Sequence, residues 1–175
     1  MKVGPHSNMS LEEIIASKRA EEAIHSVHYW GYSGSLCRPG PTQDFCKWAK
    51  ETYGEAPGII LIETKSAYTS PIGYITQYSA DNNKYVSFQA PVQLQGAQFS
   101  FVASNIRAID SFCFSNYLVY GGKNAGKKLS EHLRYRVNKS FAILDESIQM
   151  SQSNQQKTPA LVATLVEPYA IWLKE

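Results

Sequence analysis

The segment from Gly121 to Lys128 has the residue types and the spacing of a phosphate-binding loop. Its sequence, GGKNAGKK, matches the pattern G-x-x-x-x-G-K and stands between an apolar strand pattern and a helix pattern. Nucleotide hydrolysis also needs a Ser or Thr hydroxyl after the lysine to hold magnesium, and Lys128 occupies that position. The chain that follows is too short for a parallel α/β sheet. The pattern therefore does not predict a nucleotide hydrolase.

The same segment does predict a site for a polyanion. Backbone N–H groups of a glycine-rich loop, lysine side chains and the N-terminus of a following helix all attract anions. Between residues 118 and 140 there are six basic residues against one acid, Glu131. We predict that RNA, DNA or an anionic membrane surface is bound by Lys123, Lys127, Lys128, Arg134, Arg136 and Lys139. The alternative is a solvated helix face with the same charges and no ligand.

Three tyrosines accompany these basic residues: Tyr117, Tyr120 and Tyr135. Aromatic rings beside cationic groups suit the stacking of single-stranded bases, which favours a nucleic-acid-binding protein. Tyrosines in strands are otherwise common core residues, and the chain has no signature of an RNA-recognition motif.

Thiol chemistry is a second class of function that the sequence leaves open. Cys37, Cys46 or Cys113 could pair with a histidine, above all in the loop 29–46, although no neighbour in the sequence activates any of them. The run from Gly31 to Ser35 is not a G-x-S-x-G nucleophile elbow, because Gly34 stands one place early. A Cys/His-dependent enzyme and a protein-interaction adaptor therefore remain alternatives, and we assign no catalytic residue.

The first predicted helix carries candidate zinc ligands. Glu21, His25 and His28 stand at spacings that could share a helix face, and Cys37 or Cys46 could complete a ligand set. The order and the spacing match no strong zinc pattern. We expect neither a metal nor another cofactor.

Composition places the chain among ordinary globular proteins. It has 175 residues, 43% hydrophobic and 18% charged, with a net charge of +2, which suits one domain over residues 1–175. No window approaches the roughly 20 apolar residues of a membrane span, and residues 1–8 lack a signal-peptide pattern. We expect a cytoplasmic, non-enzymatic binding or structural protein. A self-assembling viral matrix or capsid-type protein, located in a virion and forming a homo-oligomer, is the close variant.

The elements that must position these residues indicate an α+β fold. A flexible lead over 1–9 precedes a helix over 11–28, whose start carries a capping box from Ser10 to Glu13. A loop over 29–41 leads to a second helix over 43–53, ended by Gly54. Period-two patterns then predict an antiparallel meander of about five or six strands, with the first five over 59–68, 72–79, 84–89, 93–103 and 112–120.

The last third of the chain predicts one long amphipathic helix packed on the sheet. Apolar residues recur about every 3.6 positions at Leu129, Leu133, Val137, Phe141, Leu144 and Ile148. A polar linker over 151–159 follows. Apolar residues from 160 to 173, broken at Pro168, then predict a final strand or hairpin at an edge of the sheet, where proline is tolerated.

Overall fold

The computed structural model describes residues 1–3, 10–63, 72–133, 138–147 and 157–174. These residues form an α+β structure with an antiparallel sheet of several strands and three α-helices, as the sequence predicts. None of the helices in the described ranges is long and apolar enough to cross a membrane. The elements are β1 (Lys2–Val3), α1 (Leu11–His25), β2 (His28–Tyr32), α2 (Pro39–Tyr53), β3 (Gly58–Glu63), β4 (Ile72–Ser79), β5 (Val86–Gln95), β6 (Phe99–Cys113), β7 (Tyr117–Val119), α3 (Leu129–His132), β8 (Ala142–Leu144) and β9 (Lys157–Lys174).

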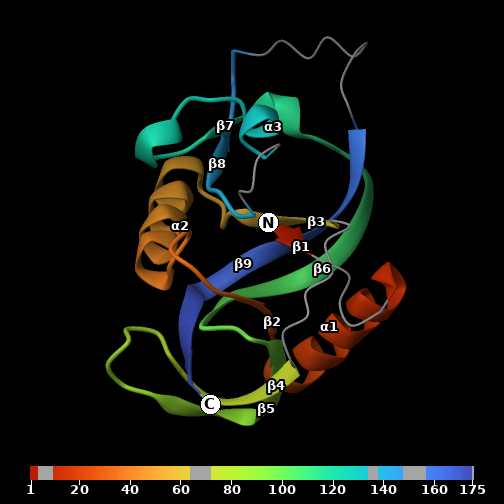
Figure 1. Cartoon of the computed structure of the whole chain (residues 1–175), viewed down its shortest axis with the longest axis vertical. Coiled ribbons are helices and arrows are strands. Elements are labelled where there is room, and N and C mark those ends of the chain that lie inside the picture. Colours follow the sequence, from red (N-terminus) through yellow and green to blue (C-terminus); the bar gives the residue numbers. More distant parts are fainter. Residues whose placement is uncertain (4–9, 64–71, 134–137, 148–156, 175) are drawn as a thin grey trace.

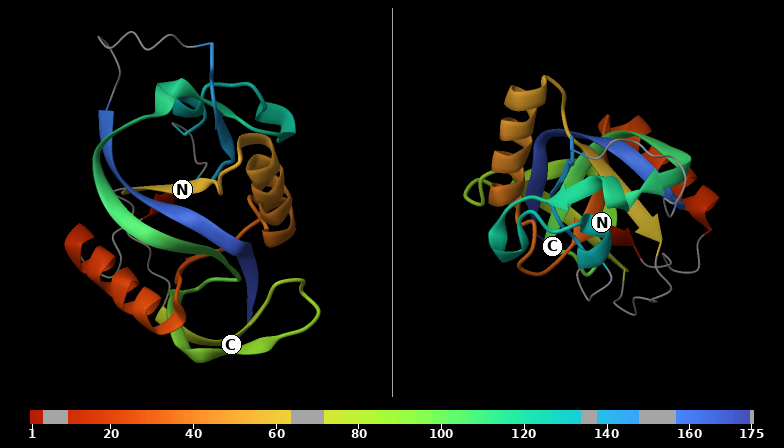
Figure 2. Two further views of the ribbon diagram at one scale, coloured as in Figure 1. Left: turned by 180° about the vertical axis from the view of Figure 1, so that it is seen from behind. Right: turned by 90° about the horizontal axis from the view of Figure 1, so that it is seen from above.

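Two long strands, β6 and β9, form the spine of the molecule. They pair antiparallel from Phe99 opposite Trp172 to Cys113 opposite Lys157. The register shifts at three places along the pair, and such irregularities bend and twist a strand. Figure 1 shows the result as two curved bands that cross the middle of the molecule, and Figures 1 and 2 show α1 and α2 on opposite sides of them.

The remaining strands attach to the free edges of this pair. Two strands pair with the same edge of β9: β3 lies beside the first half of β9, and β4 lies beside its last residues. β4 in turn forms a hairpin with β5. On the free edge of β6 lies β2, from His28 opposite Ala103 to Tyr32 opposite Phe99. β1 joins β3 in parallel, so Lys2 and Val3, which the sequence places in a flexible lead, belong to the sheet. A separate two-stranded sheet is formed by β7 and β8.

Two apolar cores lie on opposite faces of β6. Val102 belongs to a core under β4 and β5, together with Phe88 and Leu94. Phe101 and Ala103 belong to a larger core that reaches α1, α2 and β3. This alternation follows from the period of a strand, in which neighbouring side chains point to opposite faces.

Local signals account well for both long helices. The Ser10 Oγ accepts a hydrogen bond from the Glu13 N–H, and the Glu13 carboxylate accepts one from the Ser10 N–H, so the predicted capping box is confirmed. Helix α1 ends at His25, three residues earlier than predicted, because Ser26 takes the left-handed conformation. Helix α2 ends before Gly54 as predicted, but begins at Pro39, since proline fits the first turn of a helix.

The prediction of one long helix from Leu129 to Ile148 is wrong in the described residues. Only Leu129–His132 is helical, and Ala142–Leu144 forms β8, paired with β7. The Phe141 carbonyl accepts a hydrogen bond from the Tyr120 N–H, so this segment satisfies its backbone through strand pairing. Asn138–Phe141, the described residues just before β8, are not helical, so the regular apolar spacing does not continue as a helix stripe into this segment. Residues 134–137 and 148–156 lie outside the described ranges, and with them most of the predicted linker.

The predicted meander is wrong: among the described strands of the main sheet, β4 and β5 alone pair with their neighbour in sequence, and the other pairs join strands that are far apart along the chain. Several individual predictions also need correction. Residues 28–32, predicted mostly as loop, form β2. The predicted strands over 93–103 and 112–120 are divided differently, because the turn at Gly96 separates β5 from β6, and β6 runs on to Cys113. The last strand, β9, lies inside the sheet and not at its edge. Pro168 is accommodated where the β6–β9 register shifts between Ala170 and Leu165, a position that needs no ladder hydrogen bond.

Candidate functional site

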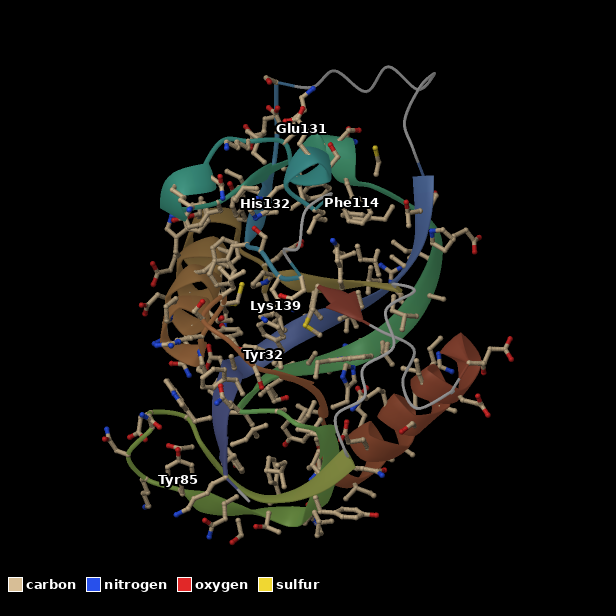
Figure 3. All side chains as sticks on the ribbon, viewed as in Figure 1. Tyr32, Tyr85, Phe114, Glu131, His132 and Lys139 are labelled. Atoms are coloured by element: carbon tan, nitrogen blue, oxygen red, sulfur yellow. The ribbon has the colours of Figure 1, made fainter. Side chains whose placement is uncertain are left out.

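A cavity of about 520 Å³ lies between α2, β3, α3 and the segment Lys139–Leu144. Its volume falls in the range of sites that hold small organic molecules, roughly 300–1,000 Å³. Figure 3 labels two of the residues that line the cavity, Phe114 and Lys139. Protein interiors are close-packed and rarely leave voids larger than a water molecule. A cavity of this size is therefore the strongest candidate for a functional site.

Helix α2 supplies one wall of the cavity through a single face. Five side chains of this face line the cavity: Thr42, Phe45, Cys46, Ala49 and Tyr53. Counted from Thr42, the other four stand three, four, seven and eleven residues later, which is the spacing that places side chains on one face of a helix. The preceding Pro39 starts the helix and Gly54 stops it, so these local signals set how far the wall extends.

Ring contacts bind this wall to the opposite side. Phe45 stacks on Phe141 with ring centroids 4.7 Å apart, and Trp48 stacks on Tyr120 at 4.6 Å. Phe45 also meets Tyr120 at 4.9 Å. Aromatic pairs at these distances contribute about 0.5–1.5 kcal/mol each beyond the area that they bury. The contacts explain why Phe141 lies in an extended segment beside α2 instead of in a helix.

The cavity has an exposed rim and a buried end. Tyr53 and Leu144 line it and are 54% and 51% exposed, which is unusual for large apolar side chains. Glu55 and Glu146 also line it and are exposed. Cys46, by contrast, has no exposed surface. The exposed part of the lining therefore includes two large apolar side chains and two carboxylates.

Lys139 lies at the buried end and is 4% exposed. Its Nζ donates hydrogen bonds to the Ser33 carbonyl at 2.9 Å and the Asn138 Oδ1 at 3.3 Å, and it lies 5.1 Å from the centre of the Tyr32 ring. Figure 3 labels Lys139 and Tyr32 next to each other in the middle of the molecule. Burial lowers the pKa of the Lys139 ammonium. Lys139 belongs to none of the ion pairs found in the described part of the chain.

Two thiols also line the cavity, those of Cys37 and Cys46. Burial raises the pKa of Cys37 to about 11 and that of Cys46 to about 12, so both are protonated at neutral pH. Among the described residues, no histidine forms a hydrogen bond with either thiol. In those residues, therefore, no imidazole stands as the base of a Cys–His pair. The Met1 amine also lines this end and donates to the Ile60 carbonyl, and burial lowers its pKa to about 5.

The structure separates the residues predicted to bind a polyanion. Lys123, Lys127 and Lys128 are exposed on the loop between β7 and α3. Lys139 is buried at the cavity, away from that exposed surface. Arg134 and Arg136 lie outside the described residues. The loop itself has a defined backbone, in which the Gly126 N–H donates to the Val119 carbonyl and the Val119 N–H to the Lys127 carbonyl, both at 2.9 Å.

The structure also does not bring together the three tyrosines near the basic residues or the candidate zinc ligands. Tyr120 packs on Phe45 and Trp48, and Tyr117 lines the cavity, whereas Tyr135 lies outside the described residues. Of the zinc set, Glu21 accepts hydrogen bonds from Lys18 and from the Tyr29 N–H, and the His25 ring packs on Tyr29 and Phe88. Over the ranges that the structure describes, no group of three or more His, Cys, Asp or Glu side chains could hold a metal ion.

The sequence contains one signal of the cavity, namely that Phe45, Trp48 and Ala49 share a helix face. That signal is ambiguous, because an apolar face is normally buried in a packed core. The aromatic partners of Phe45 and Trp48 on the other side, Tyr120 and Phe141, come from far along the chain. Comparisons with protein families, with curated proteins and with solved structures found no match, so no activity is carried over to this chain from another protein.

Proposed function

We propose that this protein is a binding protein that holds a small, largely apolar molecule in the cavity between α2, β3 and the segment Lys139–Leu144. The observation that carries the proposal is a cavity of about 520 Å³ lined by eight aromatic side chains: Phe45, Trp48, Tyr53, Phe101, Phe112, Phe114, Tyr117 and Phe141. Small-molecule sites are typically concave and lined by apolar and aromatic groups, with few polar ones. Protonated thiols and the lack of a paired base in the described residues favour binding over chemistry.

The exposed rim supports this proposal. A large apolar residue left half in water lowers the stability of a fold and needs a reason when several gather at one place. Tyr53 and Leu144 both line the cavity while about half exposed, so a bound molecule would cover them. The gain from removing apolar surface from water, about 25 cal/mol per Å², would supply the affinity.

A cavity-filling variant tests the proposal. Ala49→Phe places a ring in the cavity from α2, and Ala20→Phe makes the same change at an exposed position of α1. The purified proteins would be titrated with an environment-sensitive fluorescent naphthalene probe, with folding checked by circular dichroism. We expect the natural protein and Ala20→Phe to bind the probe, and Ala49→Phe to lose at least tenfold in affinity. No binding by the natural protein, or equal binding by all three, would show that the cavity is not a binding site.

A second candidate function is polyanion binding through the exposed lysines of the loop between β7 and α3. Its specific support is that Lys123, Lys127 and Lys128 are all exposed within six residues of a loop with a hydrogen-bonded backbone. Binding to single-stranded RNA, duplex DNA and anionic liposomes would be measured across a salt series. If three phosphates are contacted, the log–log slope for duplex DNA should be roughly −3. The slope should vanish when the three lysines are changed to Glu. Large assemblies on liposomes would favour the matrix variant.

A further inference from the structure

The buried end of the cavity contains a positive charge without a carboxylate partner. Lys139 is 4% exposed, and among the described residues no Asp or Glu oxygen lies within 4.0 Å of its Nζ. Lysine is almost never this buried unless it is paired, because removing an ammonium from water costs several kcal/mol. The groups that do contact the Nζ are a carbonyl oxygen, an amide oxygen and a ring face, which solvate the charge but leave it uncompensated.

These contacts hold the ammonium in place. The Ser33 carbonyl and the Asn138 Oδ1 occupy two of its three N–H groups, and in the described part of the chain no further hydrogen-bond acceptor takes the third. The Tyr32 ring lies beneath the charge and is itself fixed by stacking on Phe101, with centroids 4.3 Å apart. A lysine side chain without such contacts typically extends along the protein surface and keeps its ammonium group in water.

We propose that Lys139 is the counter-ion for the ligand, and that the ligand is an amphipathic monocarboxylate whose apolar body fills the aromatic cavity. This inference rests on the proposed function of the cavity. A monoanion fits because Lys139 is the one Lys or Arg among the described residues that line the cavity. A doubly charged phosphate ester would remain half compensated there.

The acidic residues at the rim give the ligand a direction. Glu55 and Glu146 line the cavity on its exposed side, so a carboxylate held there would be repelled. The same carboxylate at the buried end meets Lys139. The charges therefore favour an orientation in which the acid group lies inside and the apolar body extends toward Tyr53 and Leu144.

The test compares ligands that differ only in charge. Decanoate with decanol, and naphthylacetate with naphthylethanol, would be titrated into the natural protein at pH 7 by calorimetry. We expect at least one carboxylate to bind tenfold or more tightly than its alcohol. Equal binding of both members would overturn the role of Lys139 but leave the cavity as a binding site. If no member of either pair binds, the proposed function fails together with this inference.

Variants locate the charge that matters. Lys139→Met removes the charge at similar length, Lys139→Arg keeps it, and Lys84→Met removes an exposed charge from a residue that does not line the cavity. We expect Lys139→Met to abolish the preference for the carboxylate while the alcohol still binds. Lys139→Arg should retain part of the preference and Lys84→Met all of it. A carboxylate preference that persists in folded Lys139→Met would assign the counter-ion to another group and overturn the inference.

Discussion

The Nζ of Lys139 lies 5.1 Å from the centre of the Tyr32 ring, and these two residues join distant parts of the chain. Tyr32 ends β2, where its hydroxyl donates a hydrogen bond to the Cys37 carbonyl at 2.6 Å. Lys139 follows α3 and precedes β8. The contact therefore ties the segment that closes one side of the cavity to the central sheet.

Substitution of Tyr32 should separate the role of the ring from that of the hydroxyl. Tyr32→Phe loses one hydrogen bond and should lower the free energy of unfolding by about 1 kcal/mol. Tyr32→Leu also loses the stacking on Phe101 and the cation–π contact, and should cost about 3 kcal/mol. Urea unfolding measures both. Equal costs for the two variants would show that the ring makes no contribution of its own.

The cavity thiols should be protected by a bound ligand. Burial raises the pKa of Cys37 and Cys46, so little of either thiol is in the reactive thiolate form. In an assay run at pH 7.5, alkylation of both by iodoacetamide should be slow in the folded protein and fast in urea. Cys113 lies outside the cavity lining and serves as an internal control. Mass spectrometry of labelled peptides should show that a saturating carboxylate slows labelling of Cys37 severalfold and leaves Cys113 unchanged. Unchanged labelling of Cys37 would place the ligand elsewhere.

Carboxylate binding should weaken at alkaline pH before an ordinary lysine loses its proton. Burial holds the pKa of Lys139 below its usual value of about 10.4, and only the ammonium form attracts the ligand. Affinity should therefore fall as pH rises toward that lowered pKa, whereas alcohol binding stays level. The other titratable groups that act on Lys139 are the Met1 amine and Cys37, whose pKa values of about 5 and about 11 lie outside the range from pH 6 to 10 chosen for the titration. A flat carboxylate profile over that range would contradict the prediction.

His28 should make the fold sensitive to acid. Its imidazole is fully buried, and the Nδ1 accepts a hydrogen bond from the Trp30 indole at 3.0 Å. The Nε2 has no hydrogen-bond partner in the part of the chain that the structure describes, and it lies 3.9 Å from a Glu22 oxygen. Burial, followed by the charge of Lys18, lowers the pKa of His28 to about 4. Between about pH 6.5 and 4 the unfolded chain binds a proton that the folded protein does not, so stability falls as pH falls through this window, by up to about 3 kcal/mol.

Replacing His28 with Gln tests this dependence. Glutamine can still accept the indole hydrogen bond but does not titrate, so the loss of stability between pH 6.5 and 4 should be smaller by most of that amount. Urea unfolding across this range measures the slope, and a His25→Gln variant on α1 provides the matched control. An unchanged slope in His28→Gln would show that another group carries the acid sensitivity.

Local sequence determined those parts of the protein whose partners are a few residues away. Ser10 and Glu13 start α1, Gly54 ends α2, and the Asp81 carboxylate accepts from the Asn83 and Lys84 N–H groups in the turn after β4. Each of these contacts spans three residues or fewer, or depends on the backbone freedom of one residue. The α+β class and the strand over 72–79 follow from such signals together with period-two patterning.

Tertiary structure alone decided the rest, because the decisive partners are far apart in sequence. The period of apolar residues after Leu129 fits a helix, yet pairing of β8 with β7 and stacking of Phe141 on Phe45 hold Ala142–Leu144 as a strand. Pairing with β3, β4 and β6 places β9 inside the sheet despite Pro168. In the sequence Lys139 is one of six clustered cations, but packing against Tyr32 and Ser33 buries it at the cavity. The sequence shows that a charge is present at this position. Its burial is a property of the assembled fold, and burial decides whether water or a ligand compensates the charge.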